Sequence, residues 1–294
     1  MLPFGNIFRL AVFSVSLLTL AVRTSAQSVS VPAENPGAAQ YDVIIRNGRV
    51  LDGAGNPSIN ADIAIKDGLF AKIGHLDPQT HAKTEIDARG RYVSPGWIDV
   101  MDQSGHVLPK NGLAENKLME GVTTAIGGEG GTPVPPEQLR DYWATLERQG
   151  ISLNFGTYYS ETQARVAVLA YDARQPTPEE LERMKDLMAL AMKNGAMGMT
   201  TALIYPPSSY ASTEELIAVA KVAGKFGGIY ASHMRGEGKE LVQSIDELIR
   251  ISEEGHLPAE IFHLKAAYSP GWGTLMVEAG KHVDAARARG LDVA

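Results

Sequence analysis

Between residues 41 and 93 the chain has the short, alternating pattern of β-strands. Apolar and polar side chains alternate with a period of two over residues 61–66, and similar short apolar runs stand on either side. Such alternation is typical of strands with one buried face. The pairs Asn47-Gly48 and Asp67-Gly68 are strong signals for tight turns between strands. The pattern predicts a small β-sheet unit that is too small to bury both of its faces alone.

From residue 94 onward the pattern changes to apolar strands that alternate with amphipathic helices. We expect strands at residues 93–100, 123–127, 152–158, 196–202, 229–233 and 260–264. Two helix starts carry capping boxes, Thr177-Pro-Glu-Glu180 and Ser212-Thr-Glu-Glu215. A third apolar stripe, residues 241–249, is followed by Gly255 as a stop signal. Strands that alternate with helices in this way predict an α/β fold with a parallel sheet.

The strand–helix units are too few for a closed barrel. Six units are visible, and residues 290–294 have the pattern of an opening seventh strand. A TIM-type barrel has eight strands, so it would need two complete strands beyond that point. We therefore expect an incomplete barrel of about six to seven strands over residues 94–294, as in a fragment or a truncated product.

Composition excludes several classes of function. The 294 residues include 27 basic and 34 acidic side chains, which gives a net charge of −7, and no run of Lys or Arg stands out. This balance gives no electrostatic support for nucleic acid as a partner. The chain has no cysteine, which excludes disulfides and thiolate ligands for zinc.

The first residues have the pattern of a secretory signal. Arg9 precedes an apolar run over residues 10–22, and Thr24-Ser25-Ala26 offers the small residues that a signal peptidase requires. We expect a signal peptide over residues 1–26 and a flexible leader over residues 27–40. The mature protein would be periplasmic or extracellular, without stable membrane association. The alternative is an uncleaved membrane anchor, for which the apolar run is short.

Two successive predicted strands end in the same way. One ends with His233 followed by Arg235, and the next ends with His263 followed by Lys265. The carboxyl ends of parallel strands meet at the mouth of an α/β barrel, where barrel enzymes carry their chemistry. Both imidazoles would meet there, and neutral imidazole is a good ligand for a metal ion. For each histidine alone, the alternative is a hydrogen-bonded core residue.

Longer motifs around these histidines resemble a known family. Residues 195–216, which include Leu-Ile-Tyr-Pro-Pro, are followed by Tyr-Ala-Ser-His-Met-Arg at 230–235 and His-Leu-Lys at 263–265. These segments are similar to the N-acyl-D-amino-acid deacylase (D-aminoacylase) branch of the amidohydrolase superfamily. Residues 41–48 and 86–99 are similar to landmarks of the whole superfamily. The resemblance implies a metal-dependent (β/α)8 barrel with a small β-sandwich built from both chain ends, of which residues 41–93 would be one half.

The resemblance implies three metal ligands. His233 and His263 match the family's histidines at the ends of strands five and six, and Glu129 stands in a glycine-rich segment where relatives have a cysteine. A carboxylate is also a direct zinc ligand, and the alternative for Glu129 is a solvated loop acid. Met101 and Gln103 replace the His-x-His pair that follows the family's first strand. We therefore expect one ion instead of two, with zinc favoured and another divalent metal as the alternative.

The resemblance also implies residues that bind substrate. Lys265 and Tyr205 match family positions near the substrate carboxylate, and Arg235 follows its histidine at the same spacing as Lys265. Side chains two residues apart on a strand point to the same side. The alternative for these residues is a structural ion pair or a surface position. The family's general base is an aspartate after strand eight, which would lie beyond Ala294, so no residue of this chain is assigned as the catalytic base.

Together these features favour an amidohydrolase that cleaves a carbon–nitrogen bond in a small molecule. N-acyl-D-amino acids are the preferred substrates, and small peptides come next. One alternative is a cyclic-amide hydrolase of the dihydroorotase or hydantoinase type, but the missing His-x-His pair counts against it. A second alternative is an inactive, truncated barrel that only binds a metal or a ligand.

Overall fold

A computed structural model describes residues 39–294. The expected signal peptide and all but the last two residues of the leader lie outside the described residues. The chain divides into two compact units, with the boundary between Ser94 and Pro95. Within residues 39–294, no helix is both long enough and apolar enough to cross a membrane.

The first unit is one mixed β-sheet. Its strands are β1 (Tyr41–Val50), β2 (Ile59–Lys66), β3 (Leu69–Gly74), β4 (Ala82–Asp87) and β5 (Tyr92–Val93). They lie in the order β3-β2-β1-β4, and β5 also pairs with β1. Strand β2 is antiparallel to its two neighbours, whereas β4 and β5 are parallel to β1. Residues 39–94 form only this sheet, so a second layer of the expected sandwich is not part of the unit.

One of the two turns predicted in this unit is wrong. Strand β1 continues through Asn47 and Gly48, where its pairing with β2 shifts register as in a β-bulge. Asn47 has a left-handed φ of 56°, and its backbone N–H donates to Asp62 Oδ1 at 2.9 Å. The side chain of Asp62 thus accepts the Asn47 N–H at the bulge, and the strand continues instead of turning. The turn at Asp67-Gly68 is confirmed, since both residues have positive φ and join β2 directly to β3.

The second unit is a parallel α/β structure, as predicted. Its strands are β6 (Trp97–Asp102), β7 (Val122–Gly127), β8 (Asn154–Thr157), β9 (Tyr159–Ser160), β10 (Gly198–Ala202), β11 (Ile229–His233) and β12 (Ala259–Ile261). They form two parallel sheets, β6-β7-β8 and β9-β10-β11-β12. Val293 forms an isolated parallel bridge with Ala259, where the opening of a further strand was expected. Closure into a complete barrel is not seen in these two sheets.

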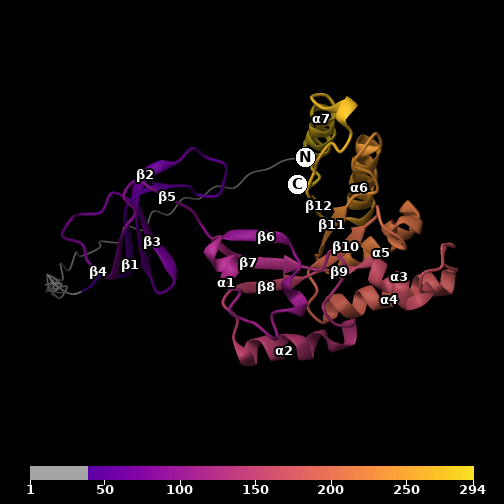
Figure 1. The fold of residues 1–294 in the computed structure, drawn as a ribbon, viewed down its shortest axis with the longest axis horizontal. Helices are drawn as coiled ribbons and strands as arrows, with labels where there is room; N and C mark the ends of the chain where they lie inside the picture. Colours follow the sequence, from indigo (N-terminus) through magenta and orange to yellow (C-terminus); the bar gives the residue numbers. More distant parts are fainter. Residues whose placement is uncertain (1–38) are drawn as a thin grey trace, which may run out of the picture. The chain divides into compact units, whose positions relative to one another are not determined.

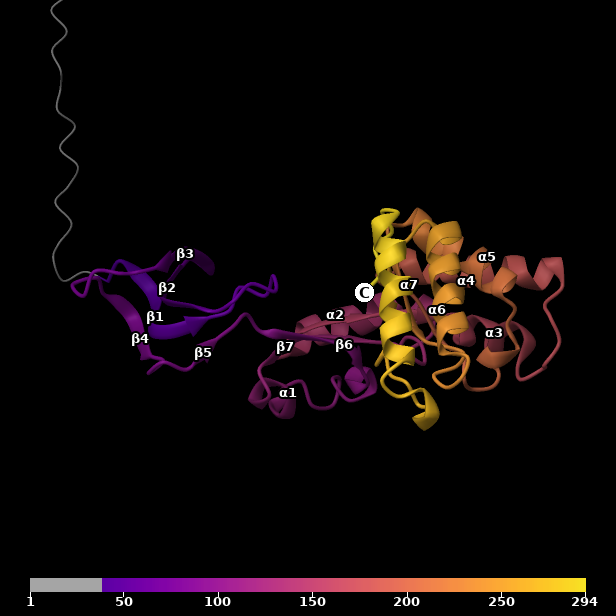
Figure 2. The same ribbon diagram turned by 90° about the horizontal axis from the view of Figure 1, so that it is seen from above.

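Helices connect the strands in chain order. They are α1 (Glu115–Met119), α2 (Leu139–Gln149), α3 (Glu161–Leu169), α4 (Pro178–Lys193), α5 (Thr213–Lys225), α6 (Leu241–Gly255) and α7 (Leu275–Ala288). Short 3-10 turns are η1 (Ser104–His106), η2 (Pro136–Gln138), η3 (Ser208–Tyr210) and η4 (Ser269–Gly271). Helices α3 to α7 pack successively against one another (Figures 1 and 2). Elements that are neighbours in sequence are therefore neighbours in space.

Strand boundaries differ from the predicted ones at both ends of this unit. The first strand was placed at residues 93–100, but Val93 belongs to β5 and β6 begins only at Trp97. Pro95 has no amide hydrogen for the sheet and therefore separates the two strands. The last strand was placed at residues 260–264, but β12 ends at Ile261. His263 follows in a turn with a left-handed φ of 38°.

The first predicted capping box is confirmed and the second is half wrong. The Thr177 side chain accepts from the Glu180 N–H, and the Glu180 carboxylate accepts from the Thr177 N–H. Ser212 likewise accepts from the Glu215 N–H at 3.2 Å. The Glu215 carboxylate, however, accepts two hydrogen bonds from Arg165 Nη1 of α3, at 2.6 and 2.8 Å. A buried cation therefore replaces the backbone donor of a complete box.

Arg165 and Glu215 belong to a buried charged cluster with Glu161. The side chain of Arg165 is 0% exposed and that of Glu215 is 2% exposed. Arg165 also donates to the carbonyl oxygens of Asp172 and Arg174. Burial raises the pKa of Glu161 well above its usual range, and the adjacent Glu215 carboxylate raises it further. The fold therefore favours the neutral form of Glu161 beside one ion pair.

This cluster predicts a pH-dependent effect of Glu161→Gln. The folded-state pKa of Glu161 lies above the unfolded value of about 4.3, so the folded chain retains a proton that the unfolded chain loses. The contribution of Glu161 to the free energy of unfolding is full below the unfolded pKa. It then falls by about 1.4 kcal/mol per pH unit until the folded pKa is reached. Glu161→Gln removes this loss, so the stability of the variant relative to wild type should rise with pH.

Urea unfolding of both chains between pH 4 and pH 8 measures the effect. The control is Glu179→Gln, which alters an exposed acid on α4 and should leave the pH dependence of unfolding as in wild type. A constant difference between Glu161→Gln and wild type across this range would contradict the neutral, buried Glu161.

Candidate functional site

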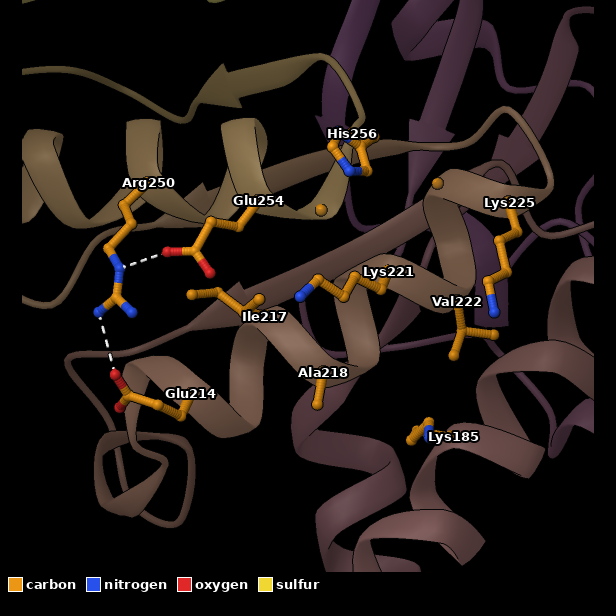
Figure 3. Close-up of a pocket in the computed structure, with 12 residues that line it drawn as sticks. Lys185, Glu214, Ile217, Ala218, Lys221, Val222, Lys225, Arg250, Glu254 and His256 are labelled. Carbon is orange, nitrogen blue, oxygen red and sulfur yellow. Dashed lines mark hydrogen bonds and ion pairs between the residues drawn. The ribbon is translucent and has the colours of Figure 1, made fainter.

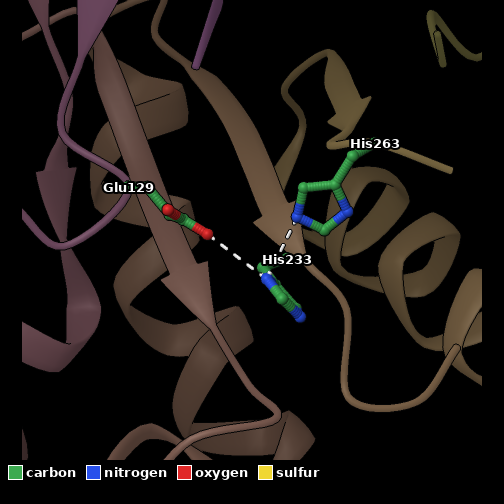
Figure 4. Close-up of side chains that lie close together, drawn as sticks. All are labelled: Glu129, His233 and His263. Carbon is green, nitrogen blue, oxygen red and sulfur yellow. Dashed lines mark hydrogen bonds and ion pairs between the residues drawn. The ribbon is translucent and has the colours of Figure 1, made fainter. Parts of the chain in front are cut away.

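Three of the predicted site residues meet at the carboxyl ends of the strands. Glu129 Oε1 lies 3.3 Å from His233 Nδ1, and His263 Nε2 lies 3.1 Å from the same nitrogen. One ligand atom from each residue falls within 4.8 Å of the other two. Figure 4 shows the Glu129 carboxylate and the His263 ring pointing at His233 from opposite sides. The structure thus brings together the three residues expected to bind metal.

Each of these residues lies at the end of a strand or shortly after it. His233 is the last residue of β11, and its side chain is 9% exposed. Glu129 follows β7 by two residues, and the intervening Gly128 has φ 103°. A Cβ at Gly128 would lie 2.4 Å from the carbonyl oxygen of Tyr158, so only glycine fits there. His263 adopts its left-handed backbone two residues after β12, a strained conformation of the kind found at functional sites.

A small apolar cluster anchors the three segments. It contains Ile126 of β7, Tyr158, Ala231 of β11 and Phe262, all buried. Ile126 comes shortly before Glu129, Ala231 precedes His233 on the strand, and Phe262 adjoins His263. Packing of these four residues therefore fixes the positions from which the polar side chains extend.

The cluster fits the donor set of a divalent metal ion. Zinc binds imidazole nitrogen and carboxylate oxygen at about 2.0–2.2 Å, and tetrahedral geometry then separates neighbouring ligand atoms by about 3.3 Å. The separations of 3.3 and 3.1 Å at His233 Nδ1 agree with this value. Two imidazoles and one carboxylate form an N/O site that suits zinc and other divalent transition metals.

Polar groups surround the cluster. Gln103 Nε2 donates to Glu129 Oε2 at 2.8 Å, which is the carboxylate oxygen that does not contact His233. Glu237 Oε1 lies 2.9 Å from His263 Nδ1 and forms an ion pair with Lys265 Nζ. The outer oxygen of Glu129 and the outer nitrogen of His263 therefore each have a polar neighbour.

Two of the three predicted substrate-binding residues lie beside the cluster. Lys265 Nζ is 3.0 Å from His263 Nδ1, and its side chain is half exposed. The Tyr205 ring packs edge-on against the His233 ring with centroids 5.2 Å apart, and most of Tyr205 remains accessible. Both side chains therefore lie next to the two histidines.

Arg235 does not contact the cluster, contrary to the prediction. Its guanidinium forms a bidentate ion pair with Glu247 of α6, with both distances at 2.9 Å. It also donates to the carbonyl oxygens of Ser209 and Ala211 at 3.0 Å. Arg235 lies beyond the end of β11, so the alternation along that strand does not apply to it. Its geometry is that of a structural ion pair, the alternative considered above.

The two acids of β6, Asp99 and Asp102, both form ion pairs with Lys117. Lys117 Nζ lies 2.5 Å from Asp99 Oδ2 and 2.6 Å from Asp102 Oδ1. Burial works to raise the pKa of Asp102, but hydrogen bonds from Lys117 and Ser104 outweigh it and lower the pKa. Asp102 is thus a charged, paired carboxylate and a poor proton acceptor.

Glu237 is the polar residue of the site that sequence reasoning missed. Its side chain is 9% exposed. The sequence does carry a signal for it, because Gly236-Glu237-Gly238 follows β11 much as Gly128-Glu129-Gly130 follows β7. In both places, an acid between glycines follows a strand that leads into the site, two residues after β7 for Glu129 and four residues after β11 for Glu237.

A separate pocket of about 590 Å³ lies between α5 and α6 (Figure 3). It is rich in cations, among them Lys185, Lys221, Lys225 and Arg250. Arg250 is held by Glu254 at 2.7 Å and by Glu214 at 3.0 Å. None of the three clustered site residues lines this pocket. A smaller hollow of about 120 Å³, lined in part by Gln103 and Gly128, adjoins the Glu129 loop instead.

Comparison with known proteins identifies relatives. No family model matches the chain. The chain is 32% identical over 254 residues to D-aminoacylase of Alcaligenes xylosoxydans xylosoxydans, across 79% of the chain and 52% of that relative. It is 29% identical over 275 residues to N-acyl-D-glutamate deacylase of the same organism, across 87% of the chain and 56% of that relative. The chain therefore spans about half the length of the curated relatives it matches.

Solved structures of the same two kinds of deacylase are similar to this chain. The crystal structure of D-aminoacylase, which defines a novel subset of amidohydrolases, superposes with a TM-score of 0.76 at 32% identity, covering 86% of this chain and 57% of that one. D-Aminoacylase has a binuclear metal centre with one-metal activation and second-metal attenuation. N-acyl-D-glutamate deacylase from Bordetella bronchiseptica, complexed with zinc and a phosphonate inhibitor, gives a TM-score of 0.75 at 28% identity, with the same coverage.

Hydantoinases are more distant. L-Hydantoinase from Arthrobacter aurescens gives a TM-score of 0.58 at 17% identity, a likeness of fold alone. In sequence and in structure, the chain is closely homologous to D-aminoacylase and N-acyl-D-glutamate deacylase over the half of those proteins that it spans.

Proposed function

We propose that this chain carries the metal-binding part of an enzyme that hydrolyses the amide bond of N-acyl-D-amino acids. One observation carries the proposal. Ligand atoms of Glu129, His233 and His263 converge at the carboxyl ends of parallel strands, in a chain homologous to D-aminoacylase. Barrel enzymes carry their active sites at this end of the strands. The parallel unit is accordingly proposed to be part of a (β/α)8 barrel.

The proposed cofactor is one zinc ion held by these three residues. The donor set and the separations of its atoms support this assignment. Gln103 supports a single ion, because its amide already donates to the outward-facing oxygen of Glu129. A second ion on that side of the carboxylate would have to displace this hydrogen bond. One-metal activation of D-aminoacylase agrees with a mononuclear site.

The remaining chemistry is assigned to the chain's own side chains. A bound zinc ion supplies Lewis acidity, polarising an amide carbonyl and lowering the pKa of water. Lys265 has an ammonium next to the cluster that is suited to the carboxylate of an N-acyl amino acid. Tyr205 flanks the same opening through its contact with His233. Asp99 and Asp102 are paired with Lys117 and are not proposed as the base.

Deacylation is better supported than ring opening of cyclic amides. Three relatives with 29–32% identity over 253–275 residues are deacylases that act on N-acyl-D-amino acids, whereas the hydantoinase likeness is limited to the fold. We further propose that the protein is exported, on the basis of the signal-like pattern of residues 1–26.

Zinc content tests the proposed metal centre. The purified chain, loaded with zinc and dialysed, should retain one equivalent per chain. Glu129→Ala removes a charged ligand and should lower zinc affinity by more than about 100-fold, beyond the loss typical of outer-shell changes. The measurement is competition with a chromophoric chelator, together with elemental analysis of the dialysed protein.

The matched control for zinc binding is Glu137→Ala. Glu137 is an exposed acid of η2 that is absent from the cluster, so its loss should leave zinc affinity unchanged. Wild-type retention of zinc by Glu129→Ala would remove Glu129 from the ligand set. Failure of the wild-type chain to bind zinc would overturn the metal centre itself.

Lys265→Met tests recognition of the substrate carboxylate. A charge-assisted hydrogen bond contributes about 1.5–3 kcal/mol, so the variant should bind N-acetyl-D-amino acids about 10–100-fold more weakly. Calorimetric titration of the zinc-loaded chain measures the binding, with turnover assayed in parallel. The comparison ligand is the corresponding N-acetyl amine without a carboxylate, whose binding should be equal in both proteins. Equal binding of the acid by both proteins would exclude Lys265 from this role.

A further inference from the structure

The two histidines present opposite edges to two different carboxylates. Nδ1 of His233 and Nε2 of His263 face each other and lie in the cluster with Glu129. Their other nitrogens face Glu237. His263 Nδ1 is 2.9 Å from Glu237 Oε1, and His233 Nε2 is 3.9 Å from the same oxygen. One buried carboxylate oxygen therefore lies behind both rings.

Glu237 is held firmly in this position. Its side chain is 9% exposed, and its backbone carbonyl accepts a hydrogen bond from the Ala267 N–H at 2.7 Å. That bond joins the segment after β11 to the segment after β12, which are the segments that follow the two histidines. Lys265 Nζ pairs with the carboxylate and balances its charge. The negative charge of the nearly buried Glu237 is thus compensated by the ammonium of Lys265.

The tautomers of the rings follow from these contacts. A neutral imidazole that binds an ion through one nitrogen carries its proton on the other. With Nε2 of His263 facing the cluster, the proton belongs on Nδ1, where Glu237 Oε1 is placed to accept it. Lys265 cannot donate to a protonated Nδ1, so its ammonium remains with Glu237. The same logic puts a proton on the buried Nε2 of His233, for which no described residue forms a hydrogen bond.

We propose that Glu237 is the positioning residue of the metal centre. It accepts the Nδ1–H of His263, which fixes the orientation and tautomer of that ring and makes Nε2 a stronger ligand. Glu237 Oε1 also lies 3.9 Å from Nε2 of His233, which is too far for a direct hydrogen bond. Glu237 is not a ligand, because its oxygen faces the outer nitrogens and not the converging atoms.

This inference rests on the proposed function only in taking the converging atoms as metal ligands. A different role for Glu237 would be that of a simple ion-pair partner of Lys265. The two roles predict different behaviour. A positioning carboxylate acts on His263 whether or not Lys265 is present, whereas an ion-pair partner matters only with Lys265.

The test compares zinc affinity of the wild-type chain with that of Glu237→Ala, Glu237→Gln and Lys265→Met. Loss of an outer carboxylate typically lowers metal affinity about 10–100-fold, which is the effect expected for Glu237→Ala. Glu237→Gln keeps an acceptor oxygen and should recover most of that loss. Lys265→Met leaves the carboxylate in place and should change zinc affinity by less than about threefold, well below the range for an outer-shell carboxylate. The control is Glu253→Ala, which removes an exposed acid from α6.

Nuclear magnetic resonance of isotope-labelled imidazole gives a second measurement. The zinc-loaded wild-type chain should show His263 protonated at Nδ1, with the downfield proton shift of a bond to carboxylate. Glu237→Ala should lose that shift, and Glu237→Gln should show a smaller one. Equal urea midpoints of the variants would exclude a general loss of structure as the cause.

Failure of this inference is distinct from failure of the metal centre. Wild-type zinc affinity and an unchanged His263 proton shift in Glu237→Ala, with zinc lost in Glu129→Ala, would overturn the role of Glu237 alone. An equal loss of affinity in Lys265→Met and Glu237→Ala would also overturn it, in favour of the ion pair. Absence of zinc binding in the wild-type chain would overturn the proposed function, and this inference with it.

Discussion

The packing of four apolar residues is the constraint on which the site depends. Ile126, Tyr158, Ala231 and Phe262 form one buried cluster, in which Ile126 comes from one parallel sheet and Ala231 from the other. Side chains that converge on one point need backbone positions that are held rigidly. Apolar burial supplies that support without competing for the polar atoms. The Thr200 hydroxyl strengthens the link between the sheets by donating to the carbonyl oxygen of Gly128, next to Glu129.

Much of the parallel unit could be predicted because its signals are local. Alternation of strands and helices, the cap at Thr177 and the convergence of His233 with His263 all follow from spacing along the chain. Contacts with distant partners account for the errors. Asn47 looks like a turn residue until Asp62, on the neighbouring strand, provides an acceptor for its N–H. Glu215 stands at the right position for a capping box, but its carboxylate binds Arg165 from another helix instead of the backbone N–H of Ser212.

Arg235 and Lys265 show this limit most clearly. Each follows a histidine by two residues, and a period of two would aim both at the site. Both strands end before these residues, so the period does not decide their direction. The nearest buried or partly buried acid decides it instead. Glu247 draws Arg235 toward α6, whereas Glu237 keeps Lys265 at the edge of the histidine cluster.

The buried trio of Glu161, Arg165 and Glu215 restricts how this sequence can diverge. Removing one partner of a buried ion pair leaves an uncompensated charge and typically costs about 3–5 kcal/mol, whereas replacing both partners by apolar residues of similar volume is often neutral. Arg165 and Glu215 stand 50 positions apart in the chain, so no single nucleotide change can exchange them together. Descendants of this sequence must either keep the pair or pass through a destabilised ancestor, and the two positions should therefore be inherited as a unit.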